Sequence, residues 1–335
     1  MKNERPFGCK AMNKLIIVII FSTSFYSCYA EDDSCWKRTI IDGTWSFEDV
    51  DGLSSSRIYS ISSITDVYAW DGNIWQPMSN SPAGDCILSL SEDNILVASN
   101  GVILQFDGFS WKDVLRTPYH FKDIWGYSEN SVFVAGYEQY TIPGPIKAKI
   151  FNYDGTEWTE MTLNDDFPVL LQSIWGSLPI DVYAVGTDEE QYGGSTGKIL
   201  HYDGNTWSVV KEDIPYGLFG IWGSSSEDIF AVGGRGHILH FNGTDWSEME
   251  TPDGTDYLST VWGASATQVY AGGGSRLYYD GIRWIDINSG SPAYFESIWG
   301  TSATNLFGVG SVFGENYEPV GTIVQYICPE PGMSR

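Results

Sequence analysis

Basic residues are scarce in this chain of 335 residues: 18 Lys and Arg stand against 43 Asp and Glu, a formal net charge of −25. Residues 31–335 hold 14 basic and 42 acidic residues, a net charge of −28. Such a surface repels phosphate backbones, which argues against nucleic-acid binding. The acids are dispersed along the sequence, so they favour solubility in an external medium over attraction for cations or basic partners.

Histidine and cysteine are also rare, with 4 and 5 copies. His237 and His240 are three residues apart on an expected strand, so they face opposite sides and form no zinc constellation. The DxDxDG spacing of calcium loops and the GxSxG nucleophile elbow are both absent from the sequence. We therefore predict no metal site, no cofactor and no catalytic residue marked by a motif.

Long apolar runs are missing except near the N-terminus, where Lys14 precedes the run 15–21. This run is shorter than the roughly 20 residues that span a membrane, and it is typical of a secretory signal. We predict a leader over 1–30, starting at Met1 or Met12 and cleaved before Glu31. Residues 25–28 also resemble a lipobox, which would make Cys28 a lipidated residue. Either route predicts export: a secreted, periplasmic or lipid-anchored protein, with membrane contact only through that anchor.

Glycine and aromatic residues are abundant, with 37 Gly and 14 Trp. They belong to a repeat that is clearest at 218–246, LFGIWGSSSEDIFAVGGRGHILHFNGTDW. Each copy contains four short apolar runs (strands a to d), and Asp-Gly or Asn-Gly between the last two indicates a hairpin. Copies lie near 47–75, 86–111, 121–158, 171–207, 218–246, 258–284 and 295–328. Repeats of this length and strand content predict an all-β, seven-bladed β-propeller over 31–328, followed by a tail at 329–335.

The last copy stops before its DGxxW motif, so it lacks strand d. Trp36 lies 11 residues before Phe47, and in the other repeats this Trp lies 10 to 13 residues before the next strand a. We predict that the N-terminal strand completes the last blade and covers an open edge. Cys35 and Cys328 fall at facing positions across the interrupted turn, which predicts a disulfide. Cys86 sits on an apolar strand as an inert core residue.

With these motifs in hand, the chain resembles bacterial exported repeat proteins whose units read IWGSSxxDVxAVGxxGxIxHYDGxxW. These are similar to the WD40-like and YVTN-like group of seven-bladed propellers. The resemblance covers about residues 31–328 and implies a propeller of the bacterial cell envelope. It is nearly silent about activity, because propellers host many unrelated functions. The repeated Trp and turn Asp residues are interpreted as scaffold.

Long insertions occur only between strands b and c, at 137–147, 187–196 and 311–320, and the linkers between strand d and the next strand a also vary. In a four-stranded meander these two connections share one face, and irregular loops on a rigid scaffold are where binding usually occurs. Candidate binding residues on the insertions are Glu138, Tyr140, Glu189, Tyr192, Asn316 and Tyr317. Linker aromatics add Tyr119, Tyr216, Tyr257 and Tyr294, although hydrophobic packing between blades is the favoured role for most of them.

Three functions remain open from the sequence. The first is a binding or scaffolding protein whose ligand is a protein or a glycan. The second is an extracellular glycan-active enzyme, such as a sialidase, which would need a cluster of Arg or carboxylates at the channel mouth. A binder would instead present mainly Tyr, Asn and backbone groups there. The third is a spacer with no ligand of its own.

Overall fold

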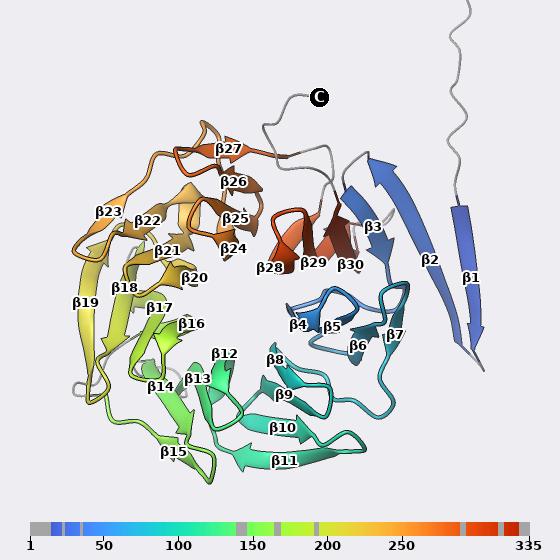
Figure 1. Cartoon of the computed structure of the whole chain (residues 1–335), viewed down its shortest axis with the longest axis horizontal. Helices are drawn as coiled ribbons and strands as arrows, with labels where there is room; N and C mark the ends of the chain where they lie inside the picture. The colour runs from blue at the N-terminus through green and yellow to red at the C-terminus, as the bar shows by residue number, and fades with distance from the viewer. Residues whose placement is uncertain are drawn as a thin grey trace, which may run out of the picture.

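The computed structural model describes residues 15–21, 24–33, 36–138, 146–163, 169–190, 194–288, 293–313 and 318–327. Seven antiparallel sheets stand around a central opening, each with its first strand innermost (Figure 1). This arrangement confirms the seven-bladed propeller with four-stranded blades that the repeats predict.

The blades follow chain order, each with its strands a to d in sequence. Blade 1 contains β4 (Asp49–Ser54), β5 (Arg57–Ile61), β6 (Val67–Trp70) and β7 (Trp75–Pro77). Blade 2 contains β8 (Cys86–Ser91), β9 (Asn94–Ser99), β10 (Val102–Phe106) and β11 (Trp111–Arg116). Blade 3 contains β12 (His120–Ser128), β13 (Ser131–Glu138), β14 (Lys147–Tyr153) and β15 (Trp158–Glu160). Blade 4 contains β16 (Leu170–Leu178), β17 (Asp181–Glu190), β18 (Gly194–Tyr202) and β19 (Trp207–Ile214).

The remaining blades repeat the plan. Blade 5 contains β20 (Leu218–Ser225), β21 (Asp228–Gly233), β22 (Ile238–Phe241) and β23 (Trp246–Glu248), with a 3-10 turn at Gly234–Gly236. Blade 6 contains β24 (Leu258–Ser265), β25 (Gln268–Gly273), β26 (Leu277–Tyr279) and β27 (Trp284–Asp286). Blade 7 contains β28 (Tyr294–Ser302), β29 (Asn305–Phe313) and β30 (Pro319–Tyr326).

The turn between strands c and d is built by its aspartate. In blade 4 the Oδ1 atom of Asp203 accepts hydrogen bonds from the backbone N–H groups of Asn205 at 2.9 Å and Thr206 at 2.8 Å. Gly204 follows with φ +90°, a conformation that glycine adopts without strain. Equivalent bonds occur at the other turn aspartates: Asp71, Asp107, Asp154 and Asp280. These aspartates are scaffold, as the sequence indicates.

The IWG tryptophans lie in the seams between blades. The Trp175 indole of blade 4 covers Gly223 of blade 5 so closely that a Cβ atom on Gly223 would lie 2.6 Å from the ring. Trp125, Trp222 and Trp299 cover Gly176, Gly263 and Gly52 in the same way. The repeat therefore pairs a large ring on one blade with a glycine on the next, which explains why both residues recur together.

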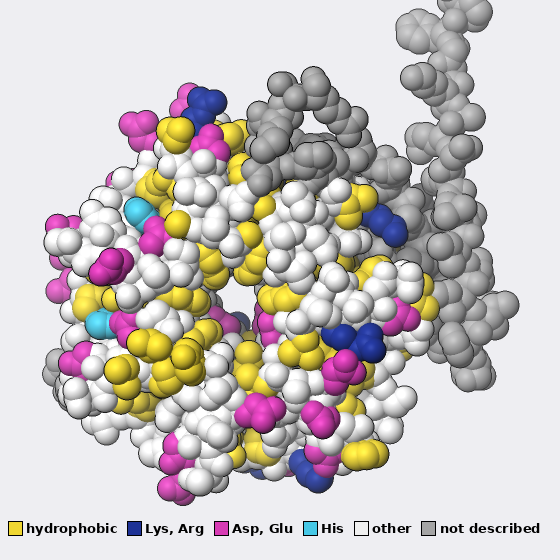
Figure 2. Space-filling view, in the orientation of Figure 1, with side chains coloured by type: hydrophobic (Ala, Val, Ile, Leu, Met, Phe, Trp, Pro, Cys, Tyr) yellow, Lys and Arg dark blue, Asp and Glu magenta, His cyan; other side chains and the backbone are white. Residues whose placement is uncertain are grey.

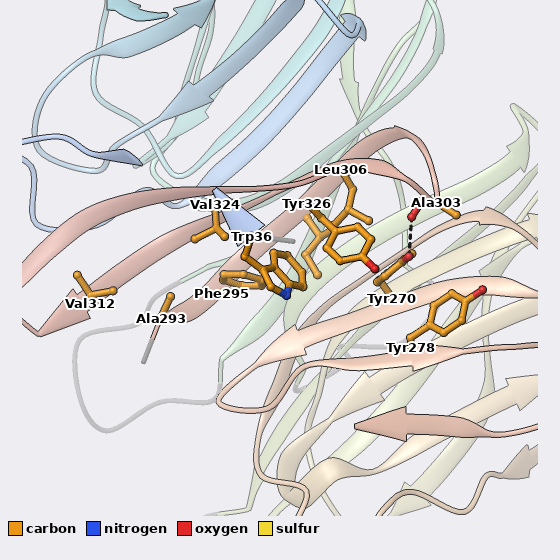
Figure 3. Packing of buried hydrophobic residues seen from close by; sticks show 11 residues of the cluster. Trp36, Tyr270, Tyr278, Ala293, Phe295, Ala303, Leu306, Val312, Val324 and Tyr326 are labelled. Atoms are coloured by element: carbon orange, nitrogen blue, oxygen red, sulfur yellow. Dashed lines mark hydrogen bonds between the residues drawn. The ribbon is translucent and has the colours of Figure 1, made fainter. Parts of the chain in front are cut away.

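Ring closure is made by β3 (Trp36–Ile40), which pairs antiparallel with β30 and places Trp36 opposite Tyr326. Trp36 is 5% exposed, and its ring centroid lies 4.7 Å from that of Tyr326 and 6.1 Å from that of Phe295 (Figure 3). The closure predicted from the position of Trp36 is confirmed. Cys35 and Cys328, which carry the predicted disulfide, lie outside the described residues. Cys86 is a buried free thiol.

Residues of the expected leader form a hairpin in this structure. It consists of β1 (Leu15–Phe21) and β2 (Ser24–Asp33), and it extends the blade 7 sheet outward from β3 (Figure 1). The β-branched run at 15–20 suits strands, which gives a physical reason for extended structure here. No helix in the described part of the chain is long and apolar enough to cross a membrane.

Candidate functional site

The central channel opens into a pocket of about 110 Å³ on the face that carries the b–c and d–a connections. Its walls are residues at the beginning of the innermost strands. Two successive positions, aligned by the strand a–b register, supply most of the lining in every blade except blade 2, which supplies Asp85 alone. Lining residues from these positions are Glu48, Asp49, Asp85, Lys122, Asp123, Gln172, Ser173, Phe219, Gly220, Ser259, Thr260, Glu296 and Ser297.

Acidic residues from four neighbouring blades meet in this pocket: Glu296, Glu48, Asp49, Asp85 and Asp123. Lys122 is the single basic residue of the lining, and charged side chains of both signs are visible within the central opening (Figure 2). The expectation that the acids are merely dispersed is therefore wrong at this place. They are far apart in sequence but occupy equivalent blade positions, which the ring brings together. In the sequence, these acids occupy the two variable positions of the LxxIWG motif, and that shared position could have identified them as a cluster.

Asp49 links three blades. Its Oδ2 atom accepts a hydrogen bond from the Ile87 backbone N–H of blade 2 at 2.9 Å. Its Oδ1 atom accepts one from the Ser297 hydroxyl of blade 7 at 2.7 Å and one from the Val50 N–H at 2.8 Å. The carboxyl group thus satisfies a backbone donor of the next blade.

Asp123 makes the corresponding link between blades 3 and 4. Its Oδ2 atom accepts hydrogen bonds from the Ile174 N–H at 2.8 Å and the Ser173 hydroxyl at 2.7 Å. Between blades 4 and 5, the Ser173 hydroxyl accepts a longer hydrogen bond from the Ile221 N–H at 3.4 Å. At this position of blade 4, serine therefore supplies an acceptor without a charge.

Burial raises the pKa of both linking aspartates. Desolvation, followed by the charge of Asp123, raises the pKa of Asp49 to about 8. Desolvation also raises the pKa of Asp123 to about 6, against the hydrogen bonds from Ile174 and Ser173 that lower it. Near neutral pH, Asp49 is mainly protonated, and negative charge in the wall is held below its formal count.

Glu296 and Glu48 form a second pair of interacting carboxyl groups. Desolvation, and then the charge of Glu48, raises the pKa of Glu296 to about 7, while Lys122 opposes the shift. Desolvation raises the pKa of Glu48 as well, and the Ser63 hydroxyl donates to its Oε1 atom at 3.0 Å. A carboxyl group that titrates near neutral pH can hold or release a proton as a ligand arrives.

Aromatic rings lie beside the uncharged part of the wall. The Phe219 ring lines the pocket, and its centroid lies 4.5 Å from that of Tyr257. Tyr257 stacks on Tyr294 at 6.0 Å, and Tyr294 is the first residue of β28, the strand that carries Glu296. Desolvation, followed by the charge of Glu296, raises the pKa of Tyr294 to about 12, so its hydroxyl keeps its proton. Two of the predicted linker aromatics, Tyr257 and Tyr294, therefore pack behind Phe219 without lining the pocket, and whether they bind a ligand stays a prediction.

The other described candidates lie in separate clusters away from this lining. Glu138 forms an ion pair with Lys149 at 3.5 Å, and the Lys149 ammonium lies 4.5 Å above the Tyr119 ring. Tyr216 contacts the His237 ring and the Arg235 guanidinium, with ring-to-group separations of 5.8 and 5.4 Å. Glu138, Tyr119 and Tyr216 are thus engaged with neighbours on their own blades, and whether they bind a ligand stays a prediction.

Tyr140, Tyr192, Asn316 and Tyr317 lie outside the described residues. The backbone of Glu189 belongs to β17, opposite Ser195, while its side chain is outside the description. Among the described residues, no group of three or more His, Cys, Asp and Glu side chains is arranged to hold a metal ion. His201 and His240 occupy equivalent places and bond Asp181 and Asp228, each at 2.7 Å, as a feature of the repeat.

Comparisons with known proteins agree on the fold. No protein-family model matches the sequence, and neither does any curated protein. Among solved structures, "YCF48 bound to D1 peptide" is 16% identical with a TM-score of 0.66, covering 90% of this chain and 99% of that one. YCF48 from Cyanidioschyzon merolae is 15% identical with a TM-score of 0.62, covering 88% and 99%. The WD40 propeller of Doa1 is 11% identical with a TM-score of 0.62, covering 84% and 92%. The chain is therefore similar in fold to WD40-type and YCF48-type propellers.

Proposed function

We propose that this chain is an exported binding propeller of the bacterial cell envelope, and that its channel mouth holds a Lys or Arg side chain of a protein partner. One observation carries the proposal: carboxyl groups from four blades and the Phe219 ring, which packs on Tyr257, line one pocket. A compact pocket with a few convergent charged groups is a common form of binding site. Its place on the face with the variable loops agrees with the face chosen from the sequence.

A cationic side chain fits both halves of this pocket. Glu48 and Glu296 supply charge-assisted hydrogen-bond acceptors, and the Phe219 ring, which packs on Tyr257, can contact an ammonium or guanidinium group through its face. An arriving positive charge lowers the pKa of Glu296, so binding releases a proton near neutral pH. Affinity for a cation should therefore rise as the pH increases through about 7.

A peptide or protein segment is the form of ligand that we favour. A propeller of similar fold has been solved "bound to D1 peptide", so a peptide is a ligand that such a scaffold accommodates. In the present chain the acidic mouth selects the chemistry of the segment, because like charges in a partner would be repelled.

The direct test is titration with short peptides of one length, rich in Lys, in Arg or in Glu. We expect saturable binding of the basic peptides, weakened by salt, and no binding of the acidic one. The double variant Glu48→Gln/Glu296→Gln should weaken binding about tenfold, or about 1.4 kcal/mol. Glu227→Gln, an exposed carboxyl group on the opposite face, is the matched control and should bind as the native chain does. Equal affinity in the double variant would contradict the assignment.

Export and anchoring need their own measurement. The basic residue before the apolar run and the sequence at 25–28 support a leader, with Cys28 as the lipid-bearing residue in the anchored form. Intact-mass analysis of the chain made in a bacterial host should give a protein beginning at Glu31, or at Cys28 with added acyl chains. An unprocessed chain in the cytosolic fraction would contradict export.

A glycan-active enzyme is the second candidate, because the mouth carries the carboxylate cluster that such an enzyme requires. Glu296, with its pKa near 7, would be the proton donor, and Glu48 the partner carboxylate. Hydrolysis of a panel of bacterial cell-surface glycans that disappears in Glu296→Gln would establish this function. Absence of turnover together with peptide binding would establish the first.

A further inference from the structure

Blade 2 lacks aromatic rings at two seam positions. The IWG tryptophan is replaced by Leu88, which packs against Gly126 of blade 3. On strand b, every other blade carries Phe or Tyr where blade 2 carries Leu96, as the strand register aligns them: Tyr59, Phe133, Tyr183, Phe230, Tyr270 and Phe307. Blade 2 is therefore the one blade in which neither position is aromatic.

In other seams, the strand b ring packs against a pair of aromatic residues on the next blade. Phe230 of blade 5 lies 5.6 Å from Tyr279 and 6.0 Å from Trp284 of blade 6. Phe307 of blade 7 lies 6.0 Å from both Trp70 and Trp75 of blade 1. Between blades 2 and 3 the aromatic pair of the next blade is present, because Tyr153 and Trp158 of blade 3 pack together at 5.4 Å. The strand b residue of blade 2 is Leu96 in place of an aromatic ring.

A pocket of about 370 Å³ occupies this seam. Apolar side chains and the Tyr153–Trp158 pair form most of its walls. Its polar residues come from the a–b and c–d turns of blade 3 and from β9 and β10 of blade 2. Its lining comprises Leu90, Asn94, Leu96, Gln105, Val114, Leu115, Glu129, Val132, Tyr153, Thr156, Glu157 and Trp158. It lies on the opposite face from the channel mouth and shares no residue with it.

The charged residues of the lining restrict the class of ligand further. Glu129 and Glu157 are exposed at this pocket, and none of its lining residues is Lys, Arg or His. We propose that this seam binds a small arylalkyl amine, with its ring in the place of the missing blade 2 aromatic and its ammonium group at Glu129 and Glu157. The apolar volume selects a flat ring, and the two carboxylates select a positive charge at one end of it.

The probe is tryptamine, titrated by ligand-observed NMR and calorimetry. We expect saturable binding to the native chain and binding at least about tenfold weaker for indole-3-propionate, which has the same ring with a negative charge. Leu96→Phe restores the residue type of the other blades and should fill the pocket. It should abolish tryptamine binding while the melting temperature is kept or raised, because the ring finds its aromatic partners.

A second variant protects the test against a failure of Leu96→Phe to fold. Glu129→Gln/Glu157→Gln changes only exposed side chains and should weaken tryptamine binding about tenfold without affecting binding of neutral indole. Glu48→Gln/Glu296→Gln at the channel mouth should bind tryptamine as the native chain does, which separates this site from the proposed function. No saturable binding at millimolar tryptamine, or unchanged binding in a folded Leu96→Phe variant, would overturn the proposal. Equal affinity for the propionate would overturn the amine assignment.

Discussion

The channel wall has two arcs that share one backbone but differ in chemistry. Blades 7, 1, 2 and 3 place Glu296, Glu48, Asp49, Asp85 and Asp123 at the start of their innermost strands. At the same positions, blades 4, 5 and 6 place Gln172, Ser173, Phe219, Gly220, Ser259 and Thr260. The scaffold accepts both sets, so it does not require the acids. The repeat does not require these acids, and they gather on the face with the variable loops. Binding of a ligand is the best explanation for them.

The largest effect should come from opening the ring at its closing strand. This strand belongs to blade 7, which lies at one end of the acidic arc. Trp36→Ala removes a buried indole packed on Tyr326 and should cost about 3–5 kcal/mol in the free energy of unfolding. Trp207→Ala, the equivalent change in blade 4 of the uncharged arc, should cost a similar amount. Urea denaturation measures both.

Only Trp36→Ala should free a chain end. Limited proteolysis should therefore cleave Trp36→Ala early near residue 40, whereas Trp207→Ala should resist until it unfolds globally. Early cleavage in both variants, or in neither, would show that the closing strand is no weaker a point than an internal one.

The next effect is on pH dependence, and it should separate the arcs. The folded chain keeps the Asp49 proton up to about pH 8, whereas the unfolded chain releases it near the ordinary aspartate pKa of 3.8. The contribution of this group to stability is thus fully present in acid and is lost as the pH rises from about 4 to 8, by about 1.4 kcal/mol per pH unit. Asp49→Asn should remove this part of the slope and leave the parts from Asp123 and Glu296, whereas Thr260→Ser, at the matching place in blade 6, should leave the whole slope unchanged. An unchanged slope in Asp49→Asn would contradict the assigned pKa.

The smallest effect should be the same in both arcs. Asp71→Ala in blade 1 and Asp203→Ala in blade 4 each remove two hydrogen bonds from a carboxylate to its own turn. Each should lower the free energy of unfolding by about 0.5–1.5 kcal/mol, and neither should change peptide binding. A change in peptide affinity in either variant would place the turns in the binding site and blur the distinction between scaffold and site.

The fold could be predicted from the sequence because each blade repeats the same local signals. Asp203 with Gly204, and Trp175 with Gly223, recur in register around the ring, so one copy explains the others. The ring closure could also be predicted from the spacing of the repeats, because Trp36 lies where a strand d tryptophan is expected. The hairpin of β1 and β2 was not expected, because an apolar run preceded by a lysine has the pattern of a leader whatever its strand propensity.

The site was harder to predict, because it is assembled from single residues that lie one repeat apart. Glu48 and Glu296 meet only after the ring closes, and nothing in their local sequence distinguishes them from other surface acids. The linker aromatics Tyr257 and Tyr294, which pack behind Phe219, could be singled out because aromatics stand out near strand ends. The pocket between blades 2 and 3 was also missed, since a Leu at position 96 is an ordinary strand residue until it is aligned with six aromatic counterparts.

Carboxyl carbon NMR of Glu296, titrated with and without a Lys-rich peptide, tests the central claim most directly. We expect that the Glu296 carboxyl group titrates near pH 7 in the free chain and that bound peptide moves the midpoint to lower pH, because the ligand's positive charge favours the carboxylate. A midpoint near the ordinary value of 4.5 that the peptide does not shift would contradict both the buried acidic arc and its role in binding.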